Sequence, residues 1–457
     1  MPATGSAPAA PRHIVAVIGG STSAAEVAAR LAERGVVVVV LEQNPRPFGK
    51  IEDGLPRWHV ALRRKEYETI SSKLDQENVH YVPCTKVGRD IPFAELANEW
   101  GLSAVVLACG AWRDRPLPVE GADAYVGKGL VYQNPFIYWF NHLNEKDYEG
   151  PRFEIEDGVM IVGGGLASID VAKAVMLEST RHALAKRGIE VEMLELEVKG
   201  IPKILESHGL AFDDLGLEGC TLFYRRRPED MPLVEIPEGA DAAREAKVRA
   251  SRQKLLEKAM QKYRFKMEPR SAPDGLVVEG DRLVGLRFRR TRIEGGRVIP
   301  TDETYERRGA YVISSIGSIP EPMPGIPMKG ELLQFSDWEL GRIEGYPNVF
   351  SAGNVVTGKG NIVASRKHAS YVAEHVIEKF LGLGDAGHAG EEQIAEAAAE
   401  GTRQFAEGVA AAIAKQPPMA AAKQAEILAR VRERQAAVGY DGDYRAWLAR
   451  VTPPDFE

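Results

Sequence analysis

Two glycine-rich stretches of the chain have the residue types and spacing needed to bind a nucleotide. The first contains Gly19, Gly20, Ser21 and Thr22, which follow an apolar run and precede a helical pattern. Free backbone N–H groups at such a helix start bind phosphate, and an acidic residue about 20 positions later accepts hydrogen bonds from a ribose. Glu42 ends the next apolar run and fits that position. This stretch therefore predicts a dinucleotide site.

The first stretch departs from the G-x-G-x-x-G pattern, because Ser21 stands where the second glycine is expected. That glycine lets the backbone approach the pyrophosphate without an intervening Cβ atom. Ser21 must therefore be accommodated by its surroundings, or its hydroxyl must bind the phosphate. Taken alone, the stretch is equally compatible with an ordinary tight turn that binds no nucleotide.

The second stretch, at residues 163–168, keeps the first two glycines of the pattern. It follows the apolar run at 159–161 and again opens a helical pattern. One such motif is weak evidence, but two of them in one chain are typical of proteins that hold two dinucleotides face to face. We expect the second nucleotide at Gly163, Gly164, Gly165, Leu166 and Ala167.

An arginine cluster follows the strand predicted at residues 221–224. An acidic residue at this strand end would select a free ribose 2′-hydroxyl, whereas arginine selects a 2′-phosphate. Here Arg225, Arg226 and Arg227 precede the first carboxylate, Glu229. Guanidinium groups suit phosphate through paired, charge-assisted hydrogen bonds. The cluster predicts NADPH and not NADH, with an insertion after the loop helix explaining its distance from the second glycine stretch. Arginines on an exposed turn are the alternative hypothesis.

A basic helical pattern covers residues 244–266, where Glu245 and Glu257 are the only acidic residues. The whole chain has a net charge of -7, so this segment is a local exception. Such a patch can steer an acidic electron carrier to a docking site. A solvated charged helix without a partner is the alternative hypothesis.

The remaining patterns indicate the elements that must position these residues. Buried parallel strands typically have short continuous apolar sequences. The alternation of such runs with helical patterns favours an α/β fold. The Ala- and Glu-rich tail from residue 385 predicts helices that pack on the surface or bind a partner. We expect strands at residues 14–18, 36–41, 79–83, 104–108, 159–161, 221–224, 283–289, 311–316 and 348–352, and helices at 60–74, 244–266 and 361–381.

Composition limits the remaining possibilities. At 457 residues the chain is long enough for two or three domains. Its three cysteines form no C-x-x-C motif, and no metal-binding spacing is present, so an electron carrier must be an organic cofactor or a partner. The negative net charge argues against a nucleic-acid partner. No apolar run is long enough to span a bilayer and the N-terminus lacks the pattern of a secretory signal, so we expect a cytoplasmic protein.

With these motifs, the chain resembles the adrenodoxin-reductase type of ferredoxin-NADP reductase over residues 12–384, and more distantly the small subunit of glutamate synthase. The long segment before the arginine cluster resembles the first type, whereas RRRPEDMP resembles the second. Four stretches carry the resemblance: the first glycine stretch with Glu42, PFGKIEDGLPRWH at 47–59, GGGLASIDVAK at 163–173 with the later arginines, and SIGSIPEPMPGIP at 315–327 with the later glycine-rich helix start.

The resemblance implies an α/β fold of two Rossmann-like dinucleotide-binding domains, one for FAD and one for NADP. The FAD-binding domain would be made of residues 12–115 and 310–384. The NADP-binding domain, residues 116–309, would be inserted in it, and a helical extension would occupy residues 385–457. Hydride would pass from NADPH to FAD.

The resemblance also implies roles for single residues. His59 would lie close to the flavin or the nicotinamide, where it could orient the ring or help a proton leave. Cys109 stands where the family usually has Thr, and we expect a buried small thiol there. Asn354 stands where relatives carry Asp or Trp near the flavin. FAD would be bound by Gly19, Gly20, Ser21, Thr22, Glu42, Gly49, Gly353, Asn354, Gly360 and Asn361.

Three functions are compatible with this sequence. The first hypothesis is an FAD-dependent NADPH oxidoreductase that passes single electrons to a ferredoxin-like iron-sulfur protein. The second is a glutamate-synthase-like subunit that serves a larger complex, and the third is a nucleotide-binding protein without catalytic activity. Flavin colour separates the third from the others, and co-purifying subunits separate the second from the first.

Overall fold

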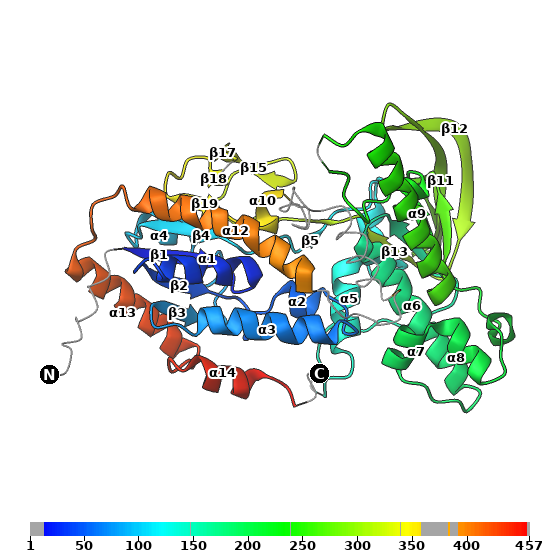
Figure 1. The fold of residues 1–457 in the computed structure, drawn as a ribbon, viewed down its shortest axis with the longest axis horizontal. Coiled ribbons are helices and arrows are strands. Elements are labelled where there is room, and N and C mark those ends of the chain that lie inside the picture. Colours follow the sequence, from blue (N-terminus) through cyan, green and yellow to red (C-terminus); the bar gives the residue numbers. More distant parts are fainter. Residues whose placement is uncertain are drawn as a thin grey trace.

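The computed structural model describes residues 13–146, 148–237, 239–338, 340–357, 383 and 392–454. In this part of the chain the ribbon forms two lobes, each built around a five-stranded parallel sheet (Figure 1). The first lobe contains segments from both ends of the chain, and the second contains its middle. None of the helices in these ranges is long and apolar enough to cross a membrane.

The sheet of the first lobe has the order β19-β4-β1-β2-β3. β1, β2 and β4 are fully buried, and this explains why each of these three strands is an uninterrupted apolar run in the sequence. The central position of β1, between β2 and β4, places the first glycine stretch at the carboxyl edge of the middle strand. The strands are β1 (Ile14–Ile18), β2 (Val37–Leu41), β3 (Val79–Val82), β4 (Ala104–Leu107) and β19 (Val349–Ser351).

Side chains of β1 alternate between two cores, one on each face of this sheet. Val15 and Val17 pack against α1, α3, α12 and α14, whereas Ile14, Ala16 and Ile18 face the core that includes α4 and α13. The tail therefore forms helices, as expected, but these helices complete both cores of the first lobe. The helices are α1 (Thr22–Ala32), α2 (Lys50–Asp53), α3 (Val60–Leu74), α4 (Phe93–Asn98), α10 (Asn354–Thr357), α12 (Glu392–Ile413), α13 (Ala421–Ala437) and α14 (Tyr444–Val451).

The sheet of the second lobe has the order β6-β13-β7-β8-β9. We expected the strand near 311–316 in the FAD-binding domain, but β13 pairs with β6 and β7 here. Val312 and Ile313 are fully buried between those two strands, and an apolar run alone does not tell which of two parallel sheets it joins. The strands are β6 (Leu130–Tyr132), β7 (Met160–Gly163), β8 (Thr221–Tyr224), β9 (Lys266–Pro269) and β13 (Val312–Ser315).

Two insertions enlarge the second lobe. One contains α7 and α8 and separates α6 from β8, which explains the long distance between the second glycine stretch and the arginine cluster. The other is an antiparallel sheet of three strands, β10-β11-β12. The elements are α5 (Gln133–His142), α6 (Leu166–Ala185), α7 (Met193–Lys199), α8 (Ile201–Ser207), α9 (Ala242–Tyr263), β10 (Ser271–Glu279), β11 (Arg282–Glu294) and β12 (Arg297–Arg308).

The chain crosses between the lobes through two antiparallel segments that pair with each other. These are β5 (Arg113–Asp114) and β14 (Ser318–Ile319). The crossing follows β4 on the way out and β13 on the way back, so it lies beside the carboxyl edges of both sheets. After it, the chain forms two small hairpins, β15 (Met328–Lys329) with β16 (Leu332–Leu333) and β17 (Phe335–Asp337) with β18 (Arg342–Ile343).

Candidate functional site

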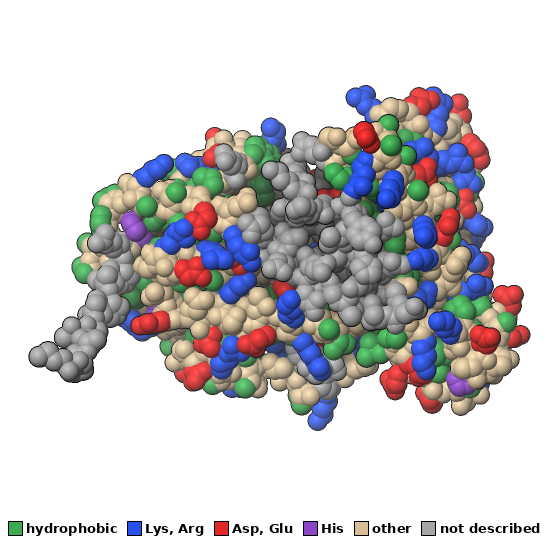
Figure 2. Space-filling model, in the orientation of Figure 1, with side chains coloured by type: hydrophobic (Ala, Val, Ile, Leu, Met, Phe, Trp, Pro, Cys, Tyr) green, Lys and Arg blue, Asp and Glu red, His purple; other side chains and the backbone are tan. Residues whose placement is uncertain are grey.

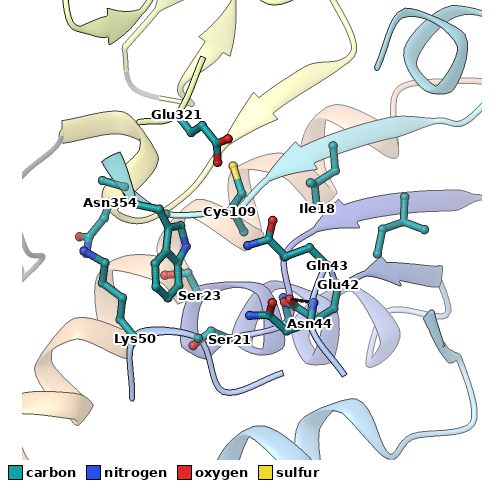
Figure 3. A pocket seen from close by; sticks show the side chains of 18 of the residues that line it. Ile18, Ser21, Ser23, Glu42, Gln43, Asn44, Lys50, Cys109, Glu321 and Asn354 are labelled. Carbon is teal, nitrogen blue, oxygen red and sulfur yellow. Dashed lines mark hydrogen bonds between the residues drawn. The ribbon is translucent and has the colours of Figure 1, made fainter. Parts of the chain in front are cut away.

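A cavity of about 540 Å³ opens at the carboxyl edge of the first sheet (Figure 3). This volume lies in the range of small-molecule sites, and the ends of β1, β2 and β4 with the start of α1 form its wall. Gly353 lies close by, since a Cβ atom on it would meet Ser23 Oγ at 2.5 Å. Gly360 and Asn361 lie outside the described residues. The expected residues at the wall are Gly19, Gly20, Ser21, Thr22, Glu42, Gly49 and Asn354.

The two glycines of the first loop are required by close backbone contacts. Gly19 has φ 106°, and a Cβ atom there would lie 2.7 Å from the Ala108 carbonyl oxygen. A Cβ atom on Gly20 would lie 2.7 Å from Cβ of Pro47. The loop therefore fits between the end of β4 and the Pro47–Gly49 segment, and it leaves the first N–H groups of α1 directed at the cavity edge.

Ser21 is accommodated by the segment that follows β2. Its hydroxyl donates a hydrogen bond to the Phe48 carbonyl oxygen at 2.9 Å. Gly49 makes room for it, because a Cβ atom on Gly49 would lie 2.9 Å from Ser21 Cβ. The serine that departs from the glycine pattern thus ties the loop to the Pro47–Gly49 segment.

Glu42 is buried at the end of β2, where it holds two backbone groups. Its carboxylate accepts hydrogen bonds from Gly20 N–H and Asn44 N–H, each at 2.7 Å. Burial raises the pKa of Glu42 to about 7, against the opposing effect of these two bonds. Figure 3 shows Glu42, Gln43 and Asn44 together at one end of the cavity.

Lys50 and Asn354 lie at the opposite end of the cavity (Figure 3), and the ring of Trp112 lies 5.4 Å from Lys50 Nζ. The Lys50 ammonium group donates to Ser318 Oγ at 3.1 Å and to Asn134 Oδ1 at 3.2 Å. The sequence interpretation missed Lys50 and Trp112. A lysine directly after the Pro-Phe-Gly motif, inside a segment expected near a cofactor, was the available signal.

Cys109 follows β4, and its side chain faces the cavity. Burial raises the pKa of its thiol to about 11, so the group stays protonated near neutral pH. A protonated thiol is a poor nucleophile. The side chain of Cys109 is only half-buried, so it is more accessible than the buried thiol that we expected.

His59 is fully buried at the start of α3 and is not among the described residues that line the cavity. The indole N–H of Trp58 donates to His59 Nε2 at 2.9 Å, which assigns the ring proton of a neutral imidazole to Nδ1. Trp58 itself packs in the core of the second lobe, edge-on against Phe140. The position of His59 beside a flavin or nicotinamide stays a prediction.

The second glycine stretch lies at the carboxyl edge of the second sheet, between two neighbouring strands. A Cβ atom on Gly163 would lie 2.5 Å from the Ser315 carbonyl oxygen, and one on Gly164 would lie 2.0 Å from the Tyr224 ring. Gly165 is the N-cap of α6 and has open space around its Cα atom. Leu166 and Ala167 form the first turn of that helix, so the expected residues lie together at one helix start.

The arginine cluster lies at the end of β8, the next strand from β7 in the second sheet. Arg225 is exposed, and Arg226 donates to the Gly296 carbonyl oxygen at 3.0 Å. Arg227 is held differently, because its Nε–H donates to Asp230 Oδ2 at 2.9 Å. Arg225 and Arg226 are therefore the two arginines whose position suits a phosphate group.

One cluster among the described residues has the spacing of a metal site: Glu52, Asp53 and His142. His142 Nε2 lies 3.1 Å from Asp53 Oδ1, and its Nδ1 lies 2.6 Å from Glu145 Oε1. Burial lowers the pKa of His142, but the two carboxylates outweigh it and raise the pKa to about 9. Both ring nitrogens of His142 lie beside carboxylates, so in this structure the cluster forms an ion-pair network.

Comparison with known proteins finds NADPH-dependent reductases among those to which the chain is similar. It is 26% identical over 184 residues to the mitochondrial NADPH:adrenodoxin oxidoreductase of Arabidopsis thaliana, covering 39% of this chain and 36% of that protein. It is 25% identical over 391 residues to a probable ferredoxin/ferredoxin-NADP reductase of Mycobacterium tuberculosis. This match covers 78% of this chain and 62% of that protein. The chain spans less than two fifths of the length of the first of these relatives. No family model matches.

A solved structure, Mycobacterium tuberculosis FprA in complex with NADPH, has the same overall fold. The aligned region includes 93% of this chain and 90% of the FprA chain, with a TM-score of 0.61 and 18% sequence identity. This likeness confirms the α/β fold with two dinucleotide-binding lobes. The named relatives confirm the resemblance to the adrenodoxin-reductase type of ferredoxin-NADP reductase.

Proposed function

We propose that the protein is an FAD-dependent NADPH oxidoreductase that acts in the cytoplasm and passes single electrons to a ferredoxin-like iron-sulfur protein. The observation that carries this proposal is the pair of glycine loops, each at the carboxyl edge of its own parallel sheet and at the start of a helix. When bound, FAD would supply the redox chemistry: it would accept hydride from NADPH, which leaves as NADP⁺, and return the two electrons singly to two acceptor molecules.

The residues of the first lobe fit FAD. The N–H groups of Ser21 and Thr22 at the start of α1 would bind the pyrophosphate beside Gly19 and Gly20, and Glu42, which accepts from the Gly20 N–H, would also accept from the adenine ribose. Gly49 supports this loop through Ser21. The flavin would occupy the end of the cavity near Gly353 and Asn354. Gly360 and Asn361, which come later in the sequence, are also proposed to bind FAD.

The residues of the second lobe fit NADPH. The start of α6, at Gly163 to Ala167, would bind the pyrophosphate, and the side chains of Arg225 and Arg226 would bind the 2′-phosphate. This chain would thus bind and orient two nucleotides whose reacting rings meet between the lobes, where β5 pairs with β14. We propose His59 as a residue that supports the ring geometry there.

The visible absorption spectrum tests both cofactors at once. The purified protein is expected to show flavin absorption, and anaerobic NADPH is expected to bleach it. A colourless protein that gains no flavin on reconstitution would refute the assignment. A flavoprotein that NADPH does not bleach would refute the donor alone.

We propose that the acceptor docks on α9. Figure 2 shows Lys and Arg side chains gathered over this helix. Two of the basic residues have structural roles: Arg252 is buried and donates to the Val234 carbonyl oxygen, and Arg249 pairs with Glu245. The others would meet an acidic acceptor.

Charge reversal tests this docking site. Replacing Lys254 and Lys258 with Glu is expected to raise the apparent KM for an acidic ferredoxin several-fold and to weaken its dependence on ionic strength. Lys329→Glu, on an exposed hairpin of the first lobe, is the matched control. Equal acceptor KM values in both variants would place docking elsewhere.

A further inference from the structure

We propose that Lys50 supplies a positive charge to the flavin end of the cavity and thereby raises the midpoint potential of the bound FAD. This inference rests on the proposed function. It concerns a residue that motif comparison does not mark, since the glycine pattern and the acidic ribose ligand are satisfied without it. Four observations support it: the position of Lys50 along the cavity, its partners, the lack of an ion pair to it among the described residues, and its partial burial.

The strand order determines which end of the cavity Lys50 occupies. The adenine ribose is expected at Glu42, after β2, and the pyrophosphate at the start of α1, after β1. The rest of a dinucleotide must then continue past β1 to the side of β4 and β19. Trp112 follows β4, Asn354 follows β19, and both line the cavity together with Lys50. Lys50 is therefore at the end that the flavin ring would fill.

The partners of Lys50 hold its ammonium group in place. Ser318 Oγ lies 3.1 Å and Asn134 Oδ1 lies 3.2 Å from Nζ, and the Trp112 ring centre is 5.4 Å away. Asn134 is itself fixed, because its side-chain N–H donates to the Trp112 carbonyl oxygen at 2.9 Å. The lysine starts α2 of the first lobe, whereas Asn134 lies in α5 of the second lobe and Ser318 in the crossing strand β14. The charge is thus positioned between the two lobes.

Among the described residues, Lys50 has neutral hydrogen-bond partners and no ion pair. Asp114 is the carboxylate that acts on it, from β5, and burial raises the pKa of Asp114 to about 6. Burial lowers the pKa of Lys50 to about 8, so the ammonium form still predominates at neutral pH. A half-buried ammonium group whose hydrogen-bond partners are neutral stabilises negative charge placed beside it.

A flavin gains negative charge when it accepts hydride, so a neighbouring cation stabilises the reduced form more than the oxidised form. The matched experiment compares Lys50→Met and Lys50→Gln, which remove the charge, with Lys50→Arg, which keeps it. Lys86→Met is the control, because Lys86 lines the same cavity after β3, at the adenine end, and pairs with Glu321. FAD content, thermal unfolding and the midpoint potential by spectroelectrochemistry are measured for each protein.

The neutral variants are expected to keep FAD and to have a more negative potential, while Lys50→Arg and Lys86→Met stay at the wild-type value. A wild-type protein without FAD would overturn the proposed function. A neutral variant with lower thermal stability and an unchanged potential would show that Lys50 is only a link between the lobes, and would overturn this inference alone.

If neither neutral variant retains FAD, the midpoint potential of the wild-type protein is measured as a function of pH to test the inference. Deprotonation of Lys50 is expected to change the slope of the potential against pH above neutral pH. This change of slope should be absent in Lys50→Arg. Asp114, the other titratable group facing this position, titrates on the acidic side of neutrality. Identical curves for wild-type and Lys50→Arg proteins would overturn the inference.

Discussion

The two glycine loops share one plan but differ in how their surroundings hold a ligand. In the first lobe, Ser21 and Glu42 tie the loop to the next segment and to the end of β2, and a cavity of about 540 Å³ extends from it. In the second lobe, Gly165 has open space around it, and Arg225 is exposed at the neighbouring strand end. The same strand-loop-helix unit thus lines a cavity in one lobe and a more exposed strand edge in the other.

This difference matches the two roles in the proposed reaction. A cofactor that stays bound through many turnovers gains from burial and from a loop that is held before it binds. A nucleotide that must leave after each hydride transfer needs an accessible site, where surface arginines supply charge. The comparison predicts that substitutions in the first lobe change FAD retention, and that substitutions in the second change the apparent affinity for NADPH.

The largest effect is expected from Gly19→Ala. The new Cβ atom would lie 2.7 Å from the Ala108 carbonyl oxygen at a φ of 106°, so strain and overlap together are expected to cost at least about 2 kcal/mol of unfolding free energy. FAD should be lost on purification. Urea denaturation and flavin absorption measure the two effects.

Two control substitutions sharpen that result. Gly35 has a φ of 73°, and a Cβ atom there would have open space around it. Gly35→Ala is therefore expected to add only about 1 kcal/mol of backbone strain, and FAD should remain bound. Gly164→Ala would place Cβ 2.0 Å from the Tyr224 ring, and it should weaken NADPH binding while FAD stays bound. Loss of FAD in Gly164→Ala would break the comparison between the lobes.

The next largest effect is expected when Arg225 and Arg226 are both replaced with Ala. Each charge-assisted bond to a 2′-phosphate is worth about 1.5 to 3 kcal/mol, so losing two of them should raise the KM for NADPH at least about a hundredfold, with little change for NADH. FAD content should not change. Arg307→Ala, an exposed arginine on β12, is the control. A wild-type enzyme that uses NADH equally well would contradict the assignment.

The sequence determined the elements of the two sites better than their surroundings. The helix expected at 60–74 is α3, and the strand at 221–224 is β8, because buried runs bounded by turns indicate their own limits. The sheet that β13 joins, the packing of the C-terminal helices on α1 and the burial of His59 depend on partners distant in sequence. Lys50 was missed for the same reason, since Asn134 and Ser318, which hold it, lie in other elements.

A pH-dependent effect is expected at Glu42 in the flavin-free protein. Its pKa is raised to about 7 in the folded protein, above the value of 4.5 for a free carboxyl group, so the folded state binds the extra proton in this range. Stability should therefore fall as the pH rises from about 4.5 to 7. Glu42→Gln should flatten this slope in chemical denaturation.

The control for Glu42 is a carboxyl group with the opposite shift. A hydrogen bond from Arg89 lowers the pKa of the half-buried Asp90, so its contribution to stability is lost as the pH falls. Asp90→Asn should therefore change only the acidic end of the stability curve. Identical curves for wild-type protein and Glu42→Gln would show that the pKa of Glu42 is not raised in the folded protein, because its two backbone bonds offset its burial.

The smallest effect is expected at the bond that most distinguishes the two loops, from Ser21 to Phe48. Ser21→Ala removes this bond and should lower the free energy of unfolding by about 1 kcal/mol. FAD should also dissociate several-fold faster, because the loop loses its tie to the Pro47–Gly49 segment. Ser72→Ala removes a similar hydroxyl-to-carbonyl bond, to Thr69 on the exposed face of α3, and should leave FAD dissociation unchanged. Equal dissociation rates in the two variants would mean that other residues lining the cavity retain FAD. The bond from Ser21 would then contribute nothing to FAD retention.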